Sequence, residues 1–367
     1  MLTRLPLETI YHIFEYLDFE DIRSIACVCS AFRLPGQLRL FKTIRIQKES
    51  LRGPPNHTAS ILSSPHLLQY PSALLVRTCW GVRPQTGISI DSLWSHLPKM
   101  HRLSYVEMFL QPSECWRALS ALESCGPTRE IVLRAEGTFT PNVLISDTPL
   151  PVHTLNLMMG ASGHQLAARV VQKSSQFLHR LDLHIKNGIT PTLPFLPHLS
   201  ELSLYMEMDI MAGGHDFISW FPFLNQHPTI TRLLLCSRFT LTVQPSPHLL
   251  PNLQFLGATP AVIERLVPGR PVSCISVVFP AILTHGLPYY VDTMLRPLRQ
   301  PVVPMTSLRI IAGSFLPSDC LIAIVQALPN LRKFILETPR YEVRQLFDSR
   351  RNSEMIGHRF LSPFKTC

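Results

Sequence analysis

One short pattern of apolar residues recurs along most of this chain and limits the folds that are open to it. Written as apolar-x-x-apolar-x-apolar, it occurs in LHRLDL at Leu178, LSELSL at Leu199, ITRLLL at Ile230 and seven further copies. The second apolar position of the ten copies falls, in order, at Leu103, Ile131, Leu155, Leu181, Leu202, Leu233, Leu256, Ile275, Ile311 and Phe334. A strand with alternating apolar positions turns one row of side chains inward and needs a second layer to bury that row. The pattern therefore predicts a repeat protein built from many similar strand units.

Amphipathic helical segments separate the predicted strands and supply that second layer. They cover residues 114–122, 164–173, 216–221, 261–267 and 319–328, and capping residues such as Ser113 and Ser318 precede two of them. A Leu-Pro turn precedes four of the strands, at Leu97, Leu196, Leu250 and Leu328. The mean spacing of about 26 residues lies within the range of leucine-rich repeats. We expect an α/β solenoid with parallel strands on its concave side and helices on its convex side.

The remaining segments fit around this repeat array. The 33 prolines suit short elements joined by many turns, because proline interrupts both helices and ladders. Residues 280–306 lengthen one repeat and are expected to carry an extra helix at 289–296. Residues 47–70 are interpreted as a linker, and an early irregular strand is expected in LQYPSALLVRTCW, which starts at Leu68. Residues 338–367 are interpreted as a basic C-terminal segment.

Composition and charge restrict the function classes. The formal net charge is +9, but the basic residues are spread along the chain instead of forming a stripe, which disfavours nucleic-acid binding. The nine cysteines form an odd, scattered set that predicts reduced thiols, and Cys27-Val28-Cys29 lacks the second ligand pair of a zinc site. No apolar stretch reaches the length of a membrane span, and acidic residues interrupt the apolar N-terminus where a signal peptide would need an unbroken run. We expect a soluble protein of the cytoplasm, the nucleus or both, with no bound metal.

The sequence lacks the common signatures of catalysis. The phosphate-binding, dinucleotide-binding, serine-hydrolase and zinc-protease motifs do not occur, and no histidine stands at ligand spacing from a second ligand. Asp182 and His184 share one strand face, where binding is as plausible as catalysis. We predict no catalytic residues and no cofactor, and hence a protein that is not an enzyme.

The N-terminus has an apolar helical pattern of a different kind. Ile10, Ile13, Phe14 and Leu17 lie on one helix face, with Pro6 in the first turn and Glu8 near the positive helix end. Asp18 can cap a second helix that carries Ile22, and a third helix is expected to be interrupted at Pro35-Gly36. Three short helices cannot bury this apolar surface alone, so they are either a cap on the solenoid or a docking module.

The order LPxE, IxxIFxxL, CVCSAFR and RLFKTIRI resembles the F-box, and the repeats resemble those of F-box proteins with leucine-rich repeats, fungal ones in particular. The likeness covers residues 4–46 and departs from the family at Phe32 and Phe41, where tryptophan is frequent. It divides the chain into an F-box (1–46), a linker (47–70), repeats (71–337) and a basic segment (338–367). The resemblance implies docking to a Skp-type adaptor and a cullin through Leu5, Pro6, Glu8, Ile10, Ile13, Phe14, Leu17, Ile22, Val28 and Cys29.

This resemblance implies the substrate-recognition subunit of a ubiquitin ligase, whose repeats present a protein target. Solenoids bind partners on the strand surface, so the outward residues expected to contact the target are Ser104, Asn156, Asp182, His184 and Ser203. Two alternatives remain: a repeat scaffold that works outside any ligase, and a nucleic-acid binder that uses the basic tail after Arg332. In each case Leu202, Leu233 and Phe334 should be buried in the strand layer.

Overall fold

The computed structural model describes residues 5–47, 62, 64–77, 90–126, 128–135, 148–160, 163–186, 192–207, 215–236, 239–279, 287–299, 302–311 and 318–337. Most of the predicted linker (48–61 and 63) and the basic segment 338–367 lie outside these residues. The chain forms two compact units, Met1–Leu253 (unit 1) and Gln254–Cys367 (unit 2).

Unit 1 begins with three helices, here called the three-helix region: α1 (Leu7–Tyr16), α2 (Phe19–Ala26) and α3 (Ser30–Leu40). The Asp18 carboxylate caps α2 as predicted, because it accepts a hydrogen bond from the Asp21 backbone N–H at 2.9 Å. Pro6 is the N-cap residue of α1, just before the first helical turn.

The third helix is longer than the sequence predicted. It runs through Pro35 and Gly36, both of which are buried, and ends only at Leu40. A Cβ atom added to Gly36 would lie 2.4 Å from the Cβ of Ala26 in α2. The glycine therefore allows α2 and α3 to approach closely, and the expected interruption at these two residues is wrong.

The strands of unit 1 are all parallel in its main sheet, in the order β1-β2-β3-β4-β5-β6-β7-β9. Their bounds are Thr43–Gln47 (β1), Ala73–Arg77 (β2), Tyr105–Leu110 (β3), Glu130–Ala135 (β4), Thr154–Met159 (β5), Arg180–Lys186 (β6), Glu201–Glu207 (β7) and Arg232–Cys236 (β9). β1 follows α3 after a two-residue turn and pairs with β2, so the sheet starts directly at the three-helix region. A separate pair is made by β8 (His215–Asp216) and β10 (Phe239–Thr240).

The predicted register holds from β4 to β9. Ile131, Leu155, Leu181, Leu202 and Leu233 are successive partners across the strands, and all five side chains are buried. In β3, however, the residue at this level is Val106, which pairs with Ile131. Leu103 is also buried but lies two residues before the strand, so its predicted place in the register is wrong by three residues.

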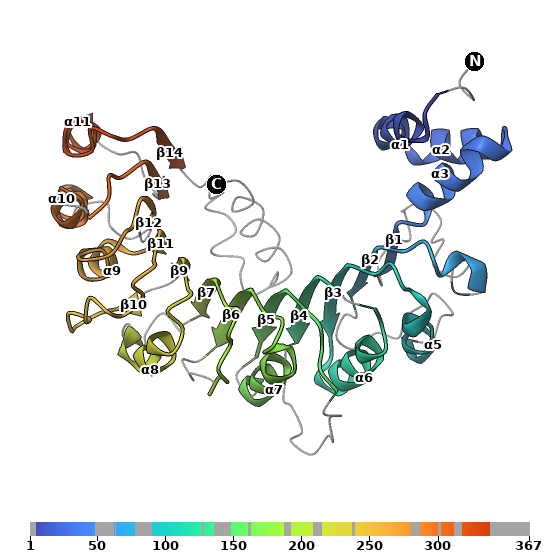
Figure 1. The fold of residues 1–367 in the computed structure, drawn as a ribbon, viewed down its shortest axis with the longest axis horizontal. Coiled ribbons are helices and arrows are strands. Elements are labelled where there is room, and N and C mark those ends of the chain that lie inside the picture. Colours follow the sequence, from blue (N-terminus) through green and yellow to red (C-terminus); the bar gives the residue numbers. More distant parts are fainter. Residues whose placement is uncertain are drawn as a thin grey trace, which may run out of the picture. The chain divides into compact units, whose positions relative to one another are not determined.

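Helices cover one side of the unit 1 sheet (Figure 1). These are α5 (Ile90–His96), α6 (Pro112–Glu123), α7 (His164–Ser174) and α8 (Phe221–Asn225), with short 3-10 turns η2 (Pro65–Leu67), η3 (Leu97–Lys99) and η4 (Phe217–Trp220). The core lies between these helices and the inward strand residues. A nearly buried ion pair between Lys173 of α7 and Glu123 of α6 joins two neighbouring helices.

Unit 2 repeats the same design with four parallel strands in the order β11-β12-β13-β14. They are Phe255–Ala258 (β11), Cys274–Val278 (β12), Ser307–Ile311 (β13) and Lys333–Glu337 (β14), with helices α9 (Pro260–Leu266), α10 (Leu287–Leu298) and α11 (Ser318–Ala327) on one side (Figure 1). α10 contains the extra helix that was predicted in the lengthened repeat.

Two predictions in unit 2 need correction. Leu308, and not Ile311, pairs with both Ile275 and Phe334, so the register of β13 is again shifted by three residues. Phe334 has the predicted register but is 41% exposed, because β14 is the last strand in the described part of the sheet and lacks a second neighbour there. Taken together, the two units confirm the predicted α/β class: three N-terminal helices, then parallel strands with helices, consistent with a repeat solenoid.

Within each unit, a recurring backbone contact links a strand of the main sheet to the one before it. The residue preceding a strand offers its carbonyl oxygen to two consecutive N–H groups of the next repeat. Thus Arg129 O accepts from His153 and Thr154, and Ser273 O accepts from Thr306 and Ser307. Because these bonds use the backbone alone, the same contact forms with Arg, His or Ser at the accepting position.

Candidate functional site

Three of the residues expected to contact an adaptor form the core of the three-helix region. Ile10, Phe14 and Ile22 are almost fully buried and pack with Phe32 in one cluster. The rings of Phe14 and Phe32 lie 6.2 Å apart between centroids. These side chains stabilise the helix packing and are not available to a partner, so the role assigned to Ile10, Phe14 and Ile22 is revised from contact to support.

A second group lies around this core. Leu5, Leu17 and Cys29 are partly buried and pack against the cluster. Replacing any of these residues would change both the packing of the helices and the exposed surface of the three-helix region. A docking experiment that relies on Leu5 would therefore confuse the two effects.

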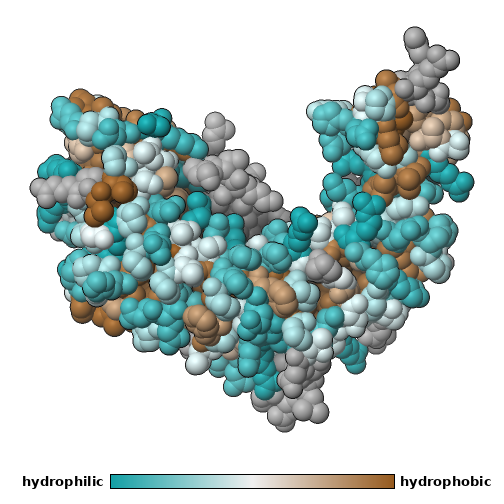
Figure 2. Space-filling view, viewed as in Figure 1, coloured by the Kyte–Doolittle hydropathy of each residue, from teal (hydrophilic) through white to brown (hydrophobic). Residues whose placement is uncertain are grey.

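The exposed members are Pro6, Glu8, Ile13 and Val28, and they form the candidate docking surface. Ile13 is 38% exposed and Val28 is 74% exposed. Three further exposed apolar residues, Leu7, Tyr16 and Leu34, were not among the residues predicted from the sequence. Leu7 lies three residues before Ile10 and seven before Phe14, so helix periodicity could have identified it. Figure 2 shows hydrophobic residues at the surface of this region. Exposed apolar side chains gathered on a small helical module are typical of a protein interface.

The sheet of unit 1 presents a second candidate surface, the strand face, on the side opposite helices α5–α8. Strand register aligns its side chains in three rows. The start row contains Tyr105, Glu130, Thr154, Arg180, Glu201 and Arg232. The middle row contains Glu107, Val132, Asn156, Asp182, Ser203 and Leu234. The end row contains Arg77, Phe109, Arg134, Met158, His184 and Tyr205.

The structure brings three of the five predicted target-binding residues together. Asn156, Asp182 and Ser203 are neighbours in the middle row, but only 5%, 3% and 6% exposed. His184 lies beside them in the end row. Ser104 lies outside the rows, just before β3, where its hydroxyl donates to the Ser72 carbonyl oxygen at 3.2 Å. Four of the five residues thus lie on the strand face, and the more accessible side chains of this face belong to the start and end rows.

Most charged groups of the strand face neutralise one another. The Arg180 guanidinium donates to the Asp182 carboxylate at 3.0 Å and lies 3.6 Å from Glu201, which is also 3.6 Å from Arg232. Arg77 lies 3.2 Å from Glu107. Such pairing leaves the face polar but without a strong net charge of either sign.

Glu107 also accepts a hydrogen bond from the Tyr105 hydroxyl at 3.0 Å. Burial, with the nearby negative charge of Glu107, raises the pKa of Tyr105 above its ordinary value. The phenol therefore stays protonated and acts as a donor within this network.

The end row contains an aromatic stack. The rings of His184 and Tyr205 are parallel, with an interplanar angle of 3° and centroids 4.1 Å apart. Burial, followed by the charge of Arg134, lowers the pKa of His184 to about 4. The imidazole is therefore neutral near pH 7. Its Nε2 atom and the Nε atom of Arg134 are buried without a hydrogen-bond partner.

Histidine rings also lie close together just before neighbouring strands. The rings of His153 and His179 lie 5.4 Å apart between centroids, and those of His179 and His198 lie 5.7 Å apart. Across the described ranges, no group of three histidine, cysteine or acidic side chains is placed to hold a metal ion. Burial raises the pKa of the Cys115 and Cys125 thiols to about 12, so neither is a ready nucleophile.

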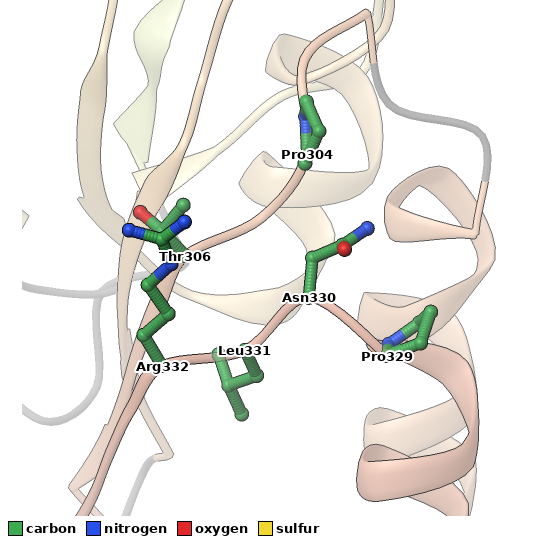
Figure 3. Close-up of a pocket in the computed structure, with 6 residues that line it drawn as sticks. All are labelled: Pro304, Thr306, Pro329, Asn330, Leu331 and Arg332. Atoms are coloured by element: carbon green, nitrogen blue, oxygen red, sulfur yellow. The ribbon is translucent and has the colours of Figure 1, made fainter.

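Unit 2 contains a pocket of about 450 Å³. Its lining comes from the turns before β13 and β14 and comprises Pro304, Thr306, Pro329, Asn330, Leu331 and Arg332. In Figure 3 the Arg332 side chain runs toward Thr306, while Asn330 points away from both. The lining offers a single charged group and no second group aimed at the same point, so it does not define a ligand.

None of the helices in the described part of the chain is both long and apolar enough to cross a membrane. Comparison with curated proteins gave no match. Comparison with protein families matched residues 2–46 to the family described as F-box-like. The match covers the three-helix region and most of β1 and leaves the repeats unassigned. Residues 2–46 of this chain thus match an F-box-like domain, and parallel strands with helices, consistent with a repeat solenoid, follow it.

Proposed function

We propose that the chain is a non-catalytic substrate-recognition subunit of a Skp/cullin/F-box-type ubiquitin ligase, acting in the cytoplasm, the nucleus or both. The observation that carries the proposal is the F-box-like match at residues 2–46, which supports an adaptor-docking role in ubiquitin ligases. F-box domains generally bind Skp-type adaptors, and the exposed residues Pro6, Ile13 and Val28 offer an apolar surface for that contact. We assign adaptor docking to this surface.

The repeats are proposed to be leucine-rich repeats of the kind found in fungal F-box proteins, with the strand face as the target-binding surface. The regular register from β4 to β9 and a mean period of about 26 residues support this assignment. The paired charges of the start and middle rows suit a protein target better than a phosphate backbone, which would require an unpaired basic stripe.

The docking assignment is tested with exposed residues only. Ile13→Glu and Val28→Glu in the full chain should each lower capture of a Skp-type adaptor by about thirtyfold, the effect of losing an anchor of about 2 kcal/mol. Val302→Glu is a matched control, because Val302 is 63% exposed in unit 2, outside the F-box-like domain. Circular dichroism should show that all three variants keep the helix content of the parent.

The same pull-down separates the alternatives. Adaptor and cullin should co-purify with the parent and the control variant but not with the two F-box variants. If both F-box variants retained the adaptor, the docking surface would be wrong. If neither adaptor nor cullin co-purified with the parent, a ligase-independent scaffold would replace the receptor.

A further inference from the structure

We propose that Arg134, His184 and Tyr205 form a binding site for one anionic group of the target protein, the carboxylate of an acidic side chain or a side-chain phosphate. The inference deepens the proposed function, because it rests on the strand face being the target surface. The three residues belong to β4, β6 and β7 and occupy the end row.

Arg134 differs from the other strand-face arginines discussed above. Arg77, Arg180 and Arg232 each lie within 3.6 Å of a carboxylate oxygen. Within the described part of the chain Arg134 forms no hydrogen bond or ion pair, and its Nε atom is buried without a partner. A buried donor without a partner is unfavourable, and a hydrogen bond to an anionic ligand would remove this cost. Arg134 therefore has no counter-ion among the described residues, and an anionic ligand could supply one.

His184 supplies a second donor beside it. Stacking on Tyr205 fixes the orientation of the imidazole ring, and the Nε2 atom is buried without a partner. Arg134 and His184 flank Met158 in the same row, and the charge of Arg134 acts on the imidazole. A neutral imidazole donates one N–H bond, so the two side chains can bind one anion together.

The surroundings select a side chain over a nucleic-acid backbone. Phe109 and Met158 flank Arg134 in the end row and provide apolar contact on both sides. Arg77, Arg180 and Arg232 on the same face are paired with carboxylates, so the face offers no unpaired basic stripe to a continuous run of phosphates. One charge among apolar neighbours matches a single acidic or phosphorylated residue in an extended target segment.

The test titrates the full chain with sodium acetate and, separately, with sodium phosphate at constant ionic strength, using chloride as the reference. The His184 ring is followed by NMR. We expect a saturable shift with at least one of the two anions and a rise in the pKa of His184 when the anion binds. A response to acetate identifies a carboxylate as the ligand, and a response to phosphate alone identifies a phosphorylated residue.

Two variants test whether Arg134 contributes to anion binding. Arg134→Gln should weaken the response about tenfold, as expected for the loss of one charged hydrogen bond. Arg232→Gln is the matched control and should keep the response, since Glu201 retains Arg180 at 3.6 Å. The proposal fails if neither anion shifts the NMR signal of the His184 ring more than chloride does, and this measurement uses the parent chain alone. It also fails if the Arg134→Gln variant is folded and responds like the parent. Adaptor capture by the parent is measured in parallel, so that loss of the anion site and loss of the receptor role are separate outcomes.

Discussion

Replacing Gly36 with alanine should destabilise the three-helix region, although alanine is the better helix former. The added Cβ would lie 2.4 Å from the Ala26 Cβ, 3.4 Å from the Ala26 Cα and 3.5 Å from Phe14 Cε1. Carbon atoms in contact are ordinarily separated by about 3.5–4.0 Å, so α2 and α3 must move apart by about 1 Å. Both clashing atoms are fixed to the backbone, and no side-chain rotation relieves the contact. Overpacking of this kind costs up to about 3 kcal/mol, and the helix preference of alanine returns about 1 kcal/mol. We expect a net loss of about 2 kcal/mol.

Native-state hydrogen exchange of the amides in α1–α3 measures this loss region by region. The companion variant Ala26→Gly removes the opposing Cβ and should cost about 1 kcal/mol alone. In the double variant Ala26→Gly/Gly36→Ala the Cβ–Cβ clash is absent, and the helix preference of alanine at position 36 offsets the cost of glycine at position 26. Its stability should therefore resemble that of the parent, with a coupling of about 3 kcal/mol. The reasoning is refuted if Gly36→Ala stabilises the region, as helix preference alone would predict, or if the two effects simply add.

Three further predictions test the repeats. Lys173→Met should destabilise unit 1 by about 3 kcal/mol in urea unfolding, because it leaves the nearly buried carboxylate of Glu123 unpaired; a loss below 0.5 kcal/mol would mean that solvent reaches this pair. Leu202→Ala should cost about 2–5 kcal/mol, whereas Phe334→Ala should cost clearly less because its ring is 41% exposed; equal costs in thermal unfolding would contradict the burial pattern. Burial lowers the pKa of His227, whose Nε2 accepts a hydrogen bond from the Leu196 N–H at 2.8 Å. The stability that the neutral His227 ring contributes is therefore complete above the pKa of the unfolded chain, about 6.5, and is lost as the pH falls toward the pKa of the folded chain. Urea unfolding at pH 7 and pH 5.5 should therefore show lower stability at pH 5.5, and His227→Gln should lessen that difference.

The sequence predicted the repeats well where the first apolar position of the pattern was unambiguous. In β6, Leu178 lies before the strand and Leu181 begins the inward row. Before β3 the corresponding residue is Leu103, and Val106 begins the inward row; before β13 it is Met305, and Leu308 begins the inward row. Both positions are apolar and they are three residues apart, so the apolar pattern can be aligned with the strand in two registers that differ by three residues. The three-residue shifts at Leu103 and Ile311 arise in this way, and strand pairing is needed to remove them.

The candidate site was predicted less completely, for a geometric reason. Helix periodicity identified the apolar face of α1, but Ile13 of that face remains exposed while its neighbour Phe14 is buried. Which side of the stripe is covered depends on how α2 and α3 cross α1, and that crossing is set by close contacts such as the one at Gly36. In the same way, the end row of the strand face requires side chains from strands far apart in the sequence, which no local pattern reveals.

The paired backbone bonds between successive repeats have a consequence for how such a chain can change in length. Within each unit, one carbonyl oxygen joins the start of a strand to its predecessor, next to the ladder between the two strands, as when Thr306 O accepts from the N–H groups of Arg332 and Lys333. The spacing between strands is thus independent of how many residues lie in the connection. The long repeat between β12 and β13, which carries α10, joins the sheet by the same contact as shorter repeats. Insertions and deletions can therefore accumulate in the connections during evolution while the residues presented side by side on the sheet keep their neighbours.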